Sequence, residues 1–424
     1  MFNELSFVGS PLLRHCGKGS TIFHNDILLN VTDPNILWKS VPRKRIFHKV
    51  PNVPPLRFPE FIGEWEKFGF ADHLERLENG ANYDTNATEG LPMSRIETIA
   101  SYNINYDKVG HCNSRNIEHY KMKYGDILFS HINSMSHIGK TAYYYAEQPL
   151  YHGMNLLLIR CKDNLNSLFF YYLLNTPLFL RYCQIYAKQA VNQASISTSD
   201  IKRIKLSLPT LHEQNKIASF ISVIDQRIAT QNKIIQHLES LIKGISQYLF
   251  GMVSSKFIPL SQLCNIQKGQ QVNSEELTES GKYYMMNGGI IPSGYYDKYN
   301  TESNTISISE GGNSCGYVQY NDCRFWSGGH CYTITDIKSN ISTLYLFHYL
   351  KFKEQDIMAL RIGSGLPNIQ KKDIAKFPVL VLPEKQQEQI TNLLQSITTK
   401  IKVEKDCLAN LSQQKQYLLQ QMFI

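Results

Sequence analysis

Apolar residues recur at steps of three, four and seven positions along two long stretches of the chain, residues 211–250 and 384–423. Steps of this size place apolar side chains on one face of a helix. Forty residues at 1.5 Å each would form a rod of roughly 60 Å. The two stretches match at a constant offset of 173 residues, so that Ile217 corresponds to Ile390 and Phe250 to Phe423. The chain is therefore predicted to consist of two similar halves, each ending in a long helix.

An apolar face of this length needs a partner, and we expect the two helices to pair with each other as an antiparallel coiled coil. Such a pair would hold the two halves at opposite ends of a rod. The positions expected to form the contact are Ile217, Ile221, Ile224, Ile228, Ile235, Leu238, Ile390, Leu394, Ile397, Ile401, Leu408 and Leu411. The alternative is that each helix packs into a separate core.

The segments between the helices have shorter periods. Runs such as 124–130, 141–146 and 304–309 predict strands, whereas 166–187 and 344–360 have helical spacing. The expected fold class is α+β, with two domains of mixed α/β structure separated by the two paired helices and related by a pseudo-twofold internal repeat. The predicted parts are an N-terminal extension (1–53), a first mixed domain (54–207), a central helix (208–256), a second mixed domain (257–381) and a C-terminal helix (382–424).

Charge and composition narrow the partners only slightly. The net charge of +8 favours an anionic partner weakly, because residues 56–210 and 257–383 are each close to neutral. Any contact with nucleic acid must therefore come from a local patch. No apolar run approaches the ~20 residues that span a bilayer, and the N-terminus has no signal-peptide pattern. We expect a cytoplasmic protein.

The sequence lacks the usual marks of an enzyme or a metal site. The nine cysteines form no CxxC pair, and Cys315, Cys323, Cys331 and His330 do not have the spacing of a zinc site, so we expect buried thiols. No phosphate-binding loop is present, and no string matches the N/D-P-P-Y/F motif of amino-methyltransferases. Asp-Ile-Lys at 200–202 and 336–338 is at the level of chance for a nuclease signature. We expect neither catalytic residues nor a metal.

Four stretches resemble a known family. They are PPLRFPEFIGEWEKFGF (54–70), YGDILFSHINSMSHIGK (124–140), LPTLHEQNKIASFISVIDQRI (208–228) and LPEKQQEQITNLLQSITTKI (382–401). With the alternation of variable domain and long helix, they resemble the specificity subunit of type I restriction-modification systems. The resemblance covers about residues 54–424, and the LP–EQ–I signature occurs twice at half-length spacing.

The resemblance implies a function without chemistry in this chain. Each of two target recognition domains would bind one half of a split double-stranded DNA site, and the helices would set the spacer between the halves. Two methyltransferase subunits and two restriction subunits would bind the chain, and S-adenosylmethionine, ATP and Mg would belong to those partners. Two alternatives remain, a stand-alone modification enzyme with its own recognition domains and a coiled-coil scaffold that binds no nucleic acid.

Base recognition needs polar side chains on loops that reach a groove of the duplex. The candidate DNA-binding residues in the first half are Ser130, His131, Asn133, Ser136, His137, Lys140, Asn192, Gln193 and Ser195. Those in the second half are Asn287, Asn313, Ser314, Arg361 and Ser364. In many members of the family that the chain resembles, the position of His131 looks like an arginine.

The first fifty residues fit the family poorly. TIFHNDILLNV (21–31) nevertheless resembles the run around 126–129, since Asp26-Ile27-Leu28-Leu29 matches Asp126-Ile127-Leu128-Phe129. We hypothesise that residues 1–50 are a remnant of another recognition domain. The alternative is a chance match in a strand-like sequence.

Overall fold

The computed structural model describes residues 52–424 apart from 83–86, 101, 114–115, 191–192, 252–255, 364 and 366. The hypothesis about residues 1–50 lies outside the described residues, as do the candidate site residues Asn192 and Ser364. The described part belongs to a single structural unit. Within it, no helix is both long enough and apolar enough to cross a membrane.

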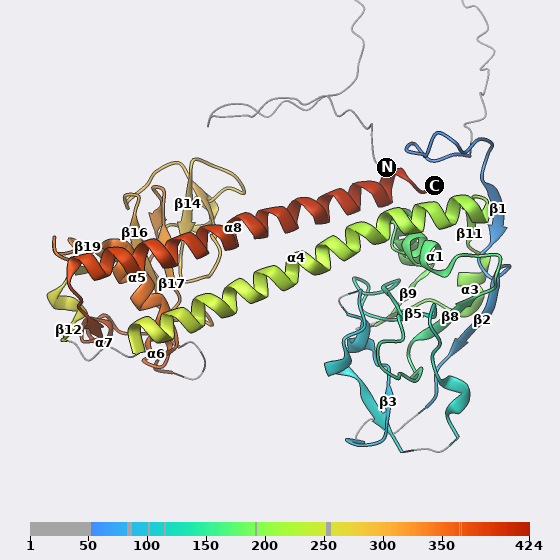
Figure 1. Cartoon of the computed structure of the whole chain (residues 1–424), viewed down its shortest axis with the longest axis horizontal. Coiled ribbons are helices and arrows are strands. Elements are labelled where there is room, and N and C mark those ends of the chain that lie inside the picture. Colours follow the sequence, from blue (N-terminus) through green and yellow to red (C-terminus); the bar gives the residue numbers. More distant parts are fainter. Residues whose placement is uncertain are drawn as a thin grey trace, which may run out of the picture. The chain divides into compact units, whose positions relative to one another are not determined.

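Two long helices, α4 (Leu211–Gly251) and α8 (Glu384–Gln421), run along each other (Figure 1). Two ion pairs fix their direction. Asp225 pairs with Lys415 at 2.6 Å, and Glu239 pairs with Lys405 at 2.7 Å. The partners' numbers rise along α4 and fall along α8, so the helices are antiparallel, as expected.

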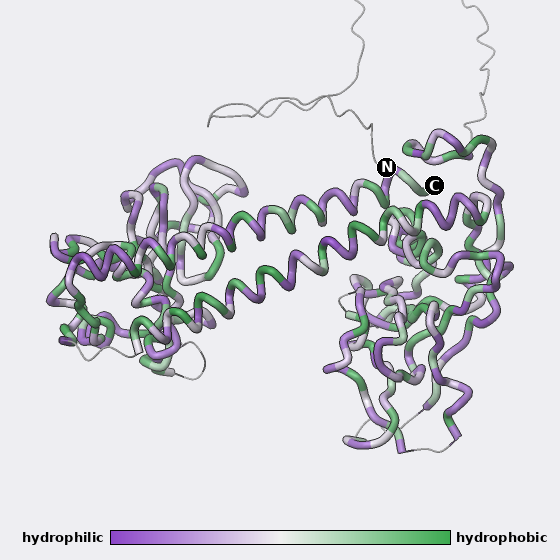
Figure 2. The backbone as a smooth tube through the Cα atoms, in the orientation of Figure 1, coloured by the Kyte–Doolittle hydropathy of each residue, from purple (hydrophilic) through white to green (hydrophobic). Residues whose placement is uncertain are grey.

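The ends of both helices belong to the cores of the mixed domains. Ile217, Ile221 and Ile224 at the start of α4 share one buried cluster with Leu418 and Phe423 at the end of the chain. A second cluster holds Phe250, Ile390 and Leu394. Along the middle of the pair Ile235 is buried, and the half-buried positions are Ile228, Leu238, Ile397, Ile401, Leu408 and Leu411. Apolar and polar residues alternate along both helices between the two clusters (Figure 2).

The part before α4, here called domain 1, is built around the four-stranded sheet β2-β8-β5-β7. Smaller sheets pair β1 with β11, β3 with β4, and β10 with β6 and β9. Its elements are β1 (Glu66–Gly69), β2 (Leu74–Asn79), β3 (Leu91–Met93), η1 (Ile96–Ile99), η2 (Tyr106–Lys108), β4 (Gly110–Cys112), η3 (Glu118–Tyr120), β5 (Ile127–Phe129), β6 (Ile132–Asn133), β7 (Thr141–Tyr143), β8 (Leu157–Cys161), α1 (Ser167–Leu174), α2 (Pro177–Tyr186), β9 (Lys188–Gln189), β10 (Ala194–Ser195), α3 (Thr198–Arg203) and β11 (Lys205–Leu208).

The part between α4 and α8, here called domain 2, contains the four-stranded sheet β13-β19-β16-β17. Smaller sheets pair β12 with β20, and β14 with β15 and β18. Its elements are β12 (Phe257–Pro259), η4 (Leu260–Gln262), β13 (Asn265–Lys268), η5 (Ser274–Glu276), β14 (Tyr283–Met286), β15 (Gly294–Tyr296), β16 (Thr305–Ser309), β17 (Val318–Asn321), β18 (Trp326–Ser327), β19 (Cys331–Thr335), α5 (Thr343–Phe352), α6 (Glu354–Met358), α7 (Lys371–Ala375) and β20 (Pro378–Leu380).

Strand registers show that the two domains repeat one plan. In the large sheets, Ile127 lies opposite Ile159 in domain 1, and Ile306 lies opposite Ile334 in domain 2. The small sheets agree, since Met93 faces Gly110 and Met285 faces Gly294. The internal repeat therefore extends from the helices through both domains.

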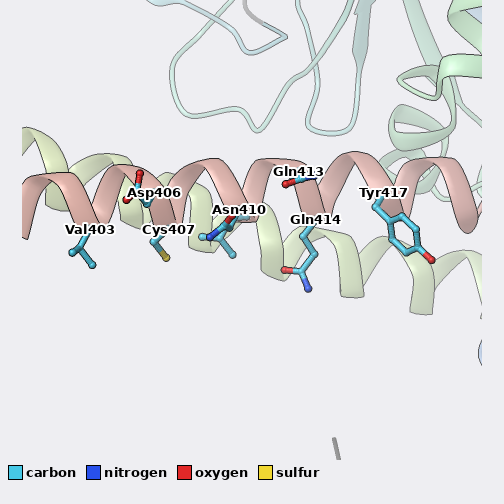
Figure 3. Close-up of a pocket in the computed structure, with 8 residues that line it drawn as sticks. Val403, Asp406, Cys407, Asn410, Gln413, Gln414 and Tyr417 are labelled. Carbon is cyan, nitrogen blue, oxygen red and sulfur yellow. The ribbon is translucent and has the colours of Figure 1, made fainter. Parts of the chain in front are cut away.

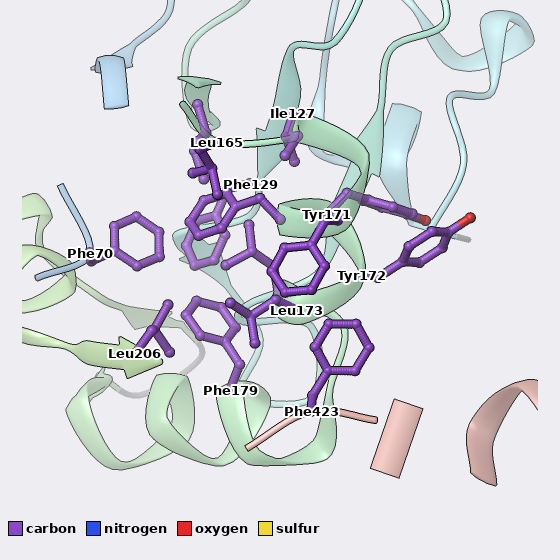
Figure 4. Packing of buried hydrophobic residues seen from close by; sticks show 14 of the residues in the cluster. Phe70, Ile127, Phe129, Leu165, Tyr171, Tyr172, Leu173, Phe179, Leu206 and Phe423 are labelled. Atoms are coloured by element: carbon purple, nitrogen blue, oxygen red, sulfur yellow. The ribbon is translucent and has the colours of Figure 1, made fainter. Parts of the chain in front are cut away.

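The core of domain 1 is rich in aromatic side chains and receives the end of the chain (Figure 4). The ring of Phe70 stacks on that of Phe179 at 5.8 Å, and Phe423 lies 5.3 Å from Phe169. Thr176 caps α2 by accepting a hydrogen bond from the backbone N–H of Phe179, and Pro177 occupies the first turn. This cap and proline explain why the helical run at 166–187 divides into α1 and α2.

A buried glutamine at the start of each long helix ties that helix to its domain. Gln214 donates to the carbonyl of Pro209 and accepts from the backbone N–H of Asn166, which caps α1. Gln387 donates to the carbonyl of Leu382 and accepts from the N–H of Ser342, which caps α5. The same three-way contact thus sets the angle between helix and domain in both halves.

Candidate nucleic-acid interface

The polar loops predicted to read DNA follow an inner strand of each large sheet, β5 in domain 1 and β16 in domain 2. In domain 1, Ser130 N–H donates to the carbonyl of Lys140 at 2.8 Å. In domain 2, Ser309 N–H donates to the carbonyl of Tyr317 at 3.0 Å. The loops therefore close in the same way, and the next residues, His131 and Glu310, occupy equivalent positions.

A second contact confirms this equivalence. The carbonyl of His131 accepts from the backbone N–H of Ile196 at 2.9 Å, and the carbonyl of Glu310 accepts from that of Ile369 at 2.8 Å. Ile196 and Ile369 are themselves 173 residues apart. The two domains thus place side chains of different chemistry, an imidazole and a carboxylate, at the same point of the fold.

In domain 1 the structure brings most of the candidates together. β6 pairs with β10, so Asn133 lies opposite Ala194, and Ile132 lies opposite Ser195. Gln193 precedes this strand and is exposed. The Ser130 hydroxyl accepts from the amide of Asn133 at 3.2 Å. Two segments more than fifty residues apart therefore form one polar surface at the end of β5.

The rest of the first loop extends this surface. His137 Nδ1 lies 3.0 Å from the hydroxyl of Ser136, which is exposed. The ammonium group of Lys140 donates to the carbonyl of Ala100 at 2.9 Å and lies over the ring of Tyr102. Tyr102 has a positive φ of 63° and is partly exposed. Neither Tyr102 nor this contact is suggested by the local sequence pattern.

His131 is a neutral group at physiological pH. Its side chain is buried, and burial lowers its pKa from the ordinary value to about 4. Its Nδ1 has no hydrogen-bond partner among the described residues. A neutral imidazole in this position can donate or accept one hydrogen bond but cannot serve as the cation that an arginine would supply.

In domain 2, Glu310 organises a network of its own. Its Oε1 accepts from the ammonium of Lys268 at 2.7 Å and from the hydroxyl of Tyr332 at 2.9 Å. Its Oε2 lies 3.5 Å from Nδ1 of His330. Burial and this carboxylate raise the pKa of Tyr332. The exposed groups of this network are Lys268 at the end of β13 and His330 in the turn before β19, and neither was among the DNA-binding candidates expected from the sequence.

Of the other candidates in domain 2, some bond to this network and others only lie near it. Asn287 accepts from the backbone N–H of His330 at 3.0 Å. Asn368 forms isolated β-bridges with both Gly311 and Ile362. Arg361, the neighbour of Ile362, is exposed. Asn313 is exposed and Ser314 half-buried in the turn that follows. Asn287 thus belongs to the network, whereas Asn313, Ser314 and Arg361 lie at its margin.

The cysteines beside this network form no ligand set. Cys315 and Cys331 are buried and Cys323 is exposed, and burial raises the pKa of Cys331 to about 11. Across the described ranges no group of three or more His, Cys, Asp or Glu side chains could hold a metal ion. The groups described above are hydrogen-bond donors and acceptors together with the ammonium of Lys268, and such groups suit the edges of bases and the phosphates.

Comparison with known families identifies the chain as a DNA specificity protein. The family described as "Type I restriction modification DNA specificity domain" matches residues 64–240 and 252–413, most of the chain. The chain belongs to this family. The two matched ranges follow the internal repeat, so each half of this specificity protein carries one copy of the domain.

Two curated relatives are specificity subunits, and one solved structure of a specificity subunit shares the fold. The chain is 30% identical over 402 residues to the putative type I restriction enzyme MjaX specificity subunit of Methanocaldococcus jannaschii, covering 85% of this chain and 92% of the relative. A putative type I specificity subunit of Mycoplasma pneumoniae is 36% identical over 121 residues, 28% of this chain and 32% of that protein. The crystal structure of the S subunit from M. genitalium superposes with a TM-score of 0.63 at 21% identity, over 88% of this chain and 99% of that one.

Proposed function

We propose that this specificity subunit recognises a bipartite double-stranded DNA site, with one half-site read by each domain. The observation that carries this is the equivalence of His131 and Glu310 within a repeated fold. A repeat with identical side chains would read two copies of one sequence. A neutral imidazole and a carboxylate with its lysine and histidine present different donors and acceptors, so the two half-sites differ.

The helix pair sets the distance between the half-sites. Each end of α4 and α8 is fixed in the core of a domain, and ion pairs hold the helices in register between these ends. A domain cannot move along the rod without breaking these contacts. The spacer between the two half-sites is therefore fixed by the length of the rod.

The helix pair also offers two related surfaces for partner subunits. A shallow pocket of about 780 Å³ runs along α8, lined by Val403, Asp406, Cys407, Asn410, Leu411, Gln413, Gln414 and Tyr417 (Figure 3). The equivalent positions on α4 include Ile234 and Leu241, which are exposed. Two such faces related by the repeat suit two copies of one partner, and we assign them to two methyltransferase subunits. Two restriction subunits complete the assembly.

We further propose that the chain itself performs no chemistry. The support is the sequence, which has neither the methyltransferase motif nor a phosphate-binding loop. S-adenosylmethionine, ATP and Mg²⁺ would act in the partner subunits, and this chain would direct them to their target.

A methylation experiment tests the proposal. The chain is expressed with its methyltransferase subunit, and methylated adenines are mapped across the host genome. We expect one motif with two different halves and a spacer of constant length, and no methylation when this chain is expressed alone. Exchange of residues 257–381 for the matching domain of a relative should change one half of the motif only. A continuous motif, or methylation without the partner, would contradict the proposal.

A further inference from the structure

Two adjacent isoleucines stand out of domain 2 beside the polar network. Ile290 is 57% exposed and Ile291 is 71% exposed. They lie in the connection from β14 to β15, residues 287–293, where Pro292 follows them. Exposing two large aliphatic side chains in sequence is unfavourable, so a binding function is the natural reason for it.

The loop that carries them is held firmly at its base. Ser293 N–H donates to the carbonyl of Met285 at 2.9 Å, and the hydroxyl of Ser309 donates to the carbonyl of Gly288 at 2.6 Å. Gly288 has a φ of +87°, and a Cβ there would lie 3.2 Å from the carbonyl oxygens of Gly311 and His330. Only glycine fits this position without strain. The isoleucines therefore project from an anchored base.

The base of the loop is part of the site itself. Asn287 accepts from His330 N–H, and Gly288 contacts Ser309, the residue before Glu310. The ammonium of Lys268, bound to Glu310, belongs to the same network. An apolar tip bordered by cationic and hydrogen-bonding groups is the arrangement by which proteins insert aliphatic wedges between base pairs while they hold the phosphates.

Domain 1 shows that the fold does not require this exposure. The equivalent connection, from β3 to β4, spans residues 94–109. Its isoleucines Ile96, Ile99 and Ile104 pack into a buried cluster with Leu128 and Leu158. The same place in the repeat is thus used for packing in one domain and for a projecting tip in the other.

We propose that Ile290 and Ile291 form a wedge that enters the duplex at the half-site read by domain 2 and unstacks one base step. This rests on the proposed function of the chain. The DNA bend that results would bring the flanking phosphates toward Lys268 and His330. Domain 1, in which the isoleucines of this connection are packed inward, would read its half-site without such insertion.

The test uses the full chain in complex with its methyltransferase subunit and a duplex that contains the mapped site. 2-Aminopurine is placed in turn at each adenine position of either half-site other than the methylated adenines, which the methyltransferase itself flips out of the stack. We expect a rise in fluorescence on binding at one step of the domain 2 half-site. The I290S/I291S variant should abolish this rise and weaken binding about tenfold, which corresponds to ~1.4 kcal/mol. The matched control is I185S, which replaces an isoleucine of 67% exposure in domain 1.

Further outcomes separate the alternatives. Unchanged fluorescence and affinity in I290S/I291S, with normal binding by the unsubstituted complex, would overturn the wedge and leave the proposed function intact. Failure of the unsubstituted complex to bind any bipartite site would overturn the proposed function instead. If replacing thymine by uracil in the half-site mimics the variant, the isoleucines contact a methyl group and insertion is wrong. If I290S/I291S no longer co-purifies with the methyltransferase subunit, the tip is a protein contact.

Discussion

Gln231 and Glu404 are equivalent residues of the two repeat copies, and they are hydrogen-bonded to each other. They are separated by 173 residues, and the Gln231 amide donates to the carbonyl oxygen of Glu404 at 3.1 Å and also to its carboxylate. A residue can meet its own repeat partner only where the internal twofold axis crosses the rod. The centre of the molecule is thus marked by a polar pair in which one side donates and the other accepts.

This pair gives the first prediction. In Gln231→Glu two carboxylates would face each other across the axis, so we expect the urea midpoint of unfolding to fall at neutral pH. Adding Glu404→Gln to this variant restores one donor and one acceptor and should recover most of the loss. Equal midpoints for Gln231→Glu and the unsubstituted chain would show that the pair contributes nothing to the helix contact.

Lengthening the rod should change the spacer. Seven residues inserted into α4 between Ile228 and Ile235, together with seven into α8 between Ile401 and Leu408, add about 10 Å. The spacer in the methylated motif should grow by about three base pairs at 3.4 Å each, while both half-sites stay the same. Because the helices are held in register by ion pairs, the insertion in α4 alone should instead lower stability. A changed half-site with an unchanged spacer would contradict this role of the rod.

The equivalent glutamines Gln214 and Gln387 should contribute equally to stability. Gln214→Ala and Gln387→Ala each leave a buried carbonyl and a capping N–H without a partner. We expect each to lower the free energy of unfolding by about 1–3 kcal/mol, measured by urea denaturation. Gln386→Ala is the matched control, because that side chain is exposed. A cost no greater than that of the control would mean that the glutamines do not anchor the helices.

Acid should weaken the fold through its buried histidines. Burial lowers the pKa of His131, His152 and His348 to about 4, below the value near 6.5 of an unfolded chain. Between these values the unfolded state binds more protons, so stability is lost as the pH falls from about 6.5 towards 4. In His348→Gln the loss between pH 7 and pH 5 should be smaller by about 2 kcal/mol. Substituting the exposed His237 in the same way is the control, and an equal effect there would contradict the assignment.

Two glycines at equivalent points of the domains should resist substitution. A Cβ on Gly80 would lie 2.2 Å from the carbonyl oxygen of Gly153, and one on Gly269 would lie 2.3 Å from that of Gly328. Backbone would have to move in either case, so Gly80→Ala and Gly269→Ala should each cost about 2 kcal/mol or more. Gly244→Ala, in open space on α4, should instead stabilise the helix slightly. The comparison is made by thermal unfolding of the three variants.

The helices, their repeat and their pairing could be predicted because they depend on the period of apolar residues. The antiparallel direction was expected as well, but it is set by contacts such as the Asp225–Lys415 ion pair rather than by that period. A repeat of the domains was expected too, but the matching of individual residues within them could not be predicted, because the offset changes. His131 and Glu310 are 179 residues apart, whereas Ser195 and Asn368 keep the offset of 173. Loops of different length, such as 94–109 and 287–293, shift one strand against the next. A comparison at one fixed offset therefore cannot match these strands, whereas their pairing registers in the structure do match them.

Candidates for the site could be named from the sequence only where they are contiguous. The loop that begins at Ser130 could be proposed because its polar residues follow a strand directly. Lys268 ends β13, Glu310 directly follows β16 and His330 directly precedes β19, so they meet only when the sheet forms. The same limit applies to Ile290 and Ile291, whose exposure is a property of the folded loop rather than of its composition.

The position of Phe423 in the core of domain 1 has a consequence for synthesis on the ribosome. Domain 2 draws its buried cluster from residues between Phe250 and Leu394, which emerge together. Domain 1 emerges first, yet its cluster needs Leu418 to Phe423, and Leu56 N–H donates to the carbonyl of Gln421. Translation at ≈ 5–20 residues per second therefore leaves the core of the first-made domain incomplete until residues 418–423 have emerged, long after the core of domain 2 can close.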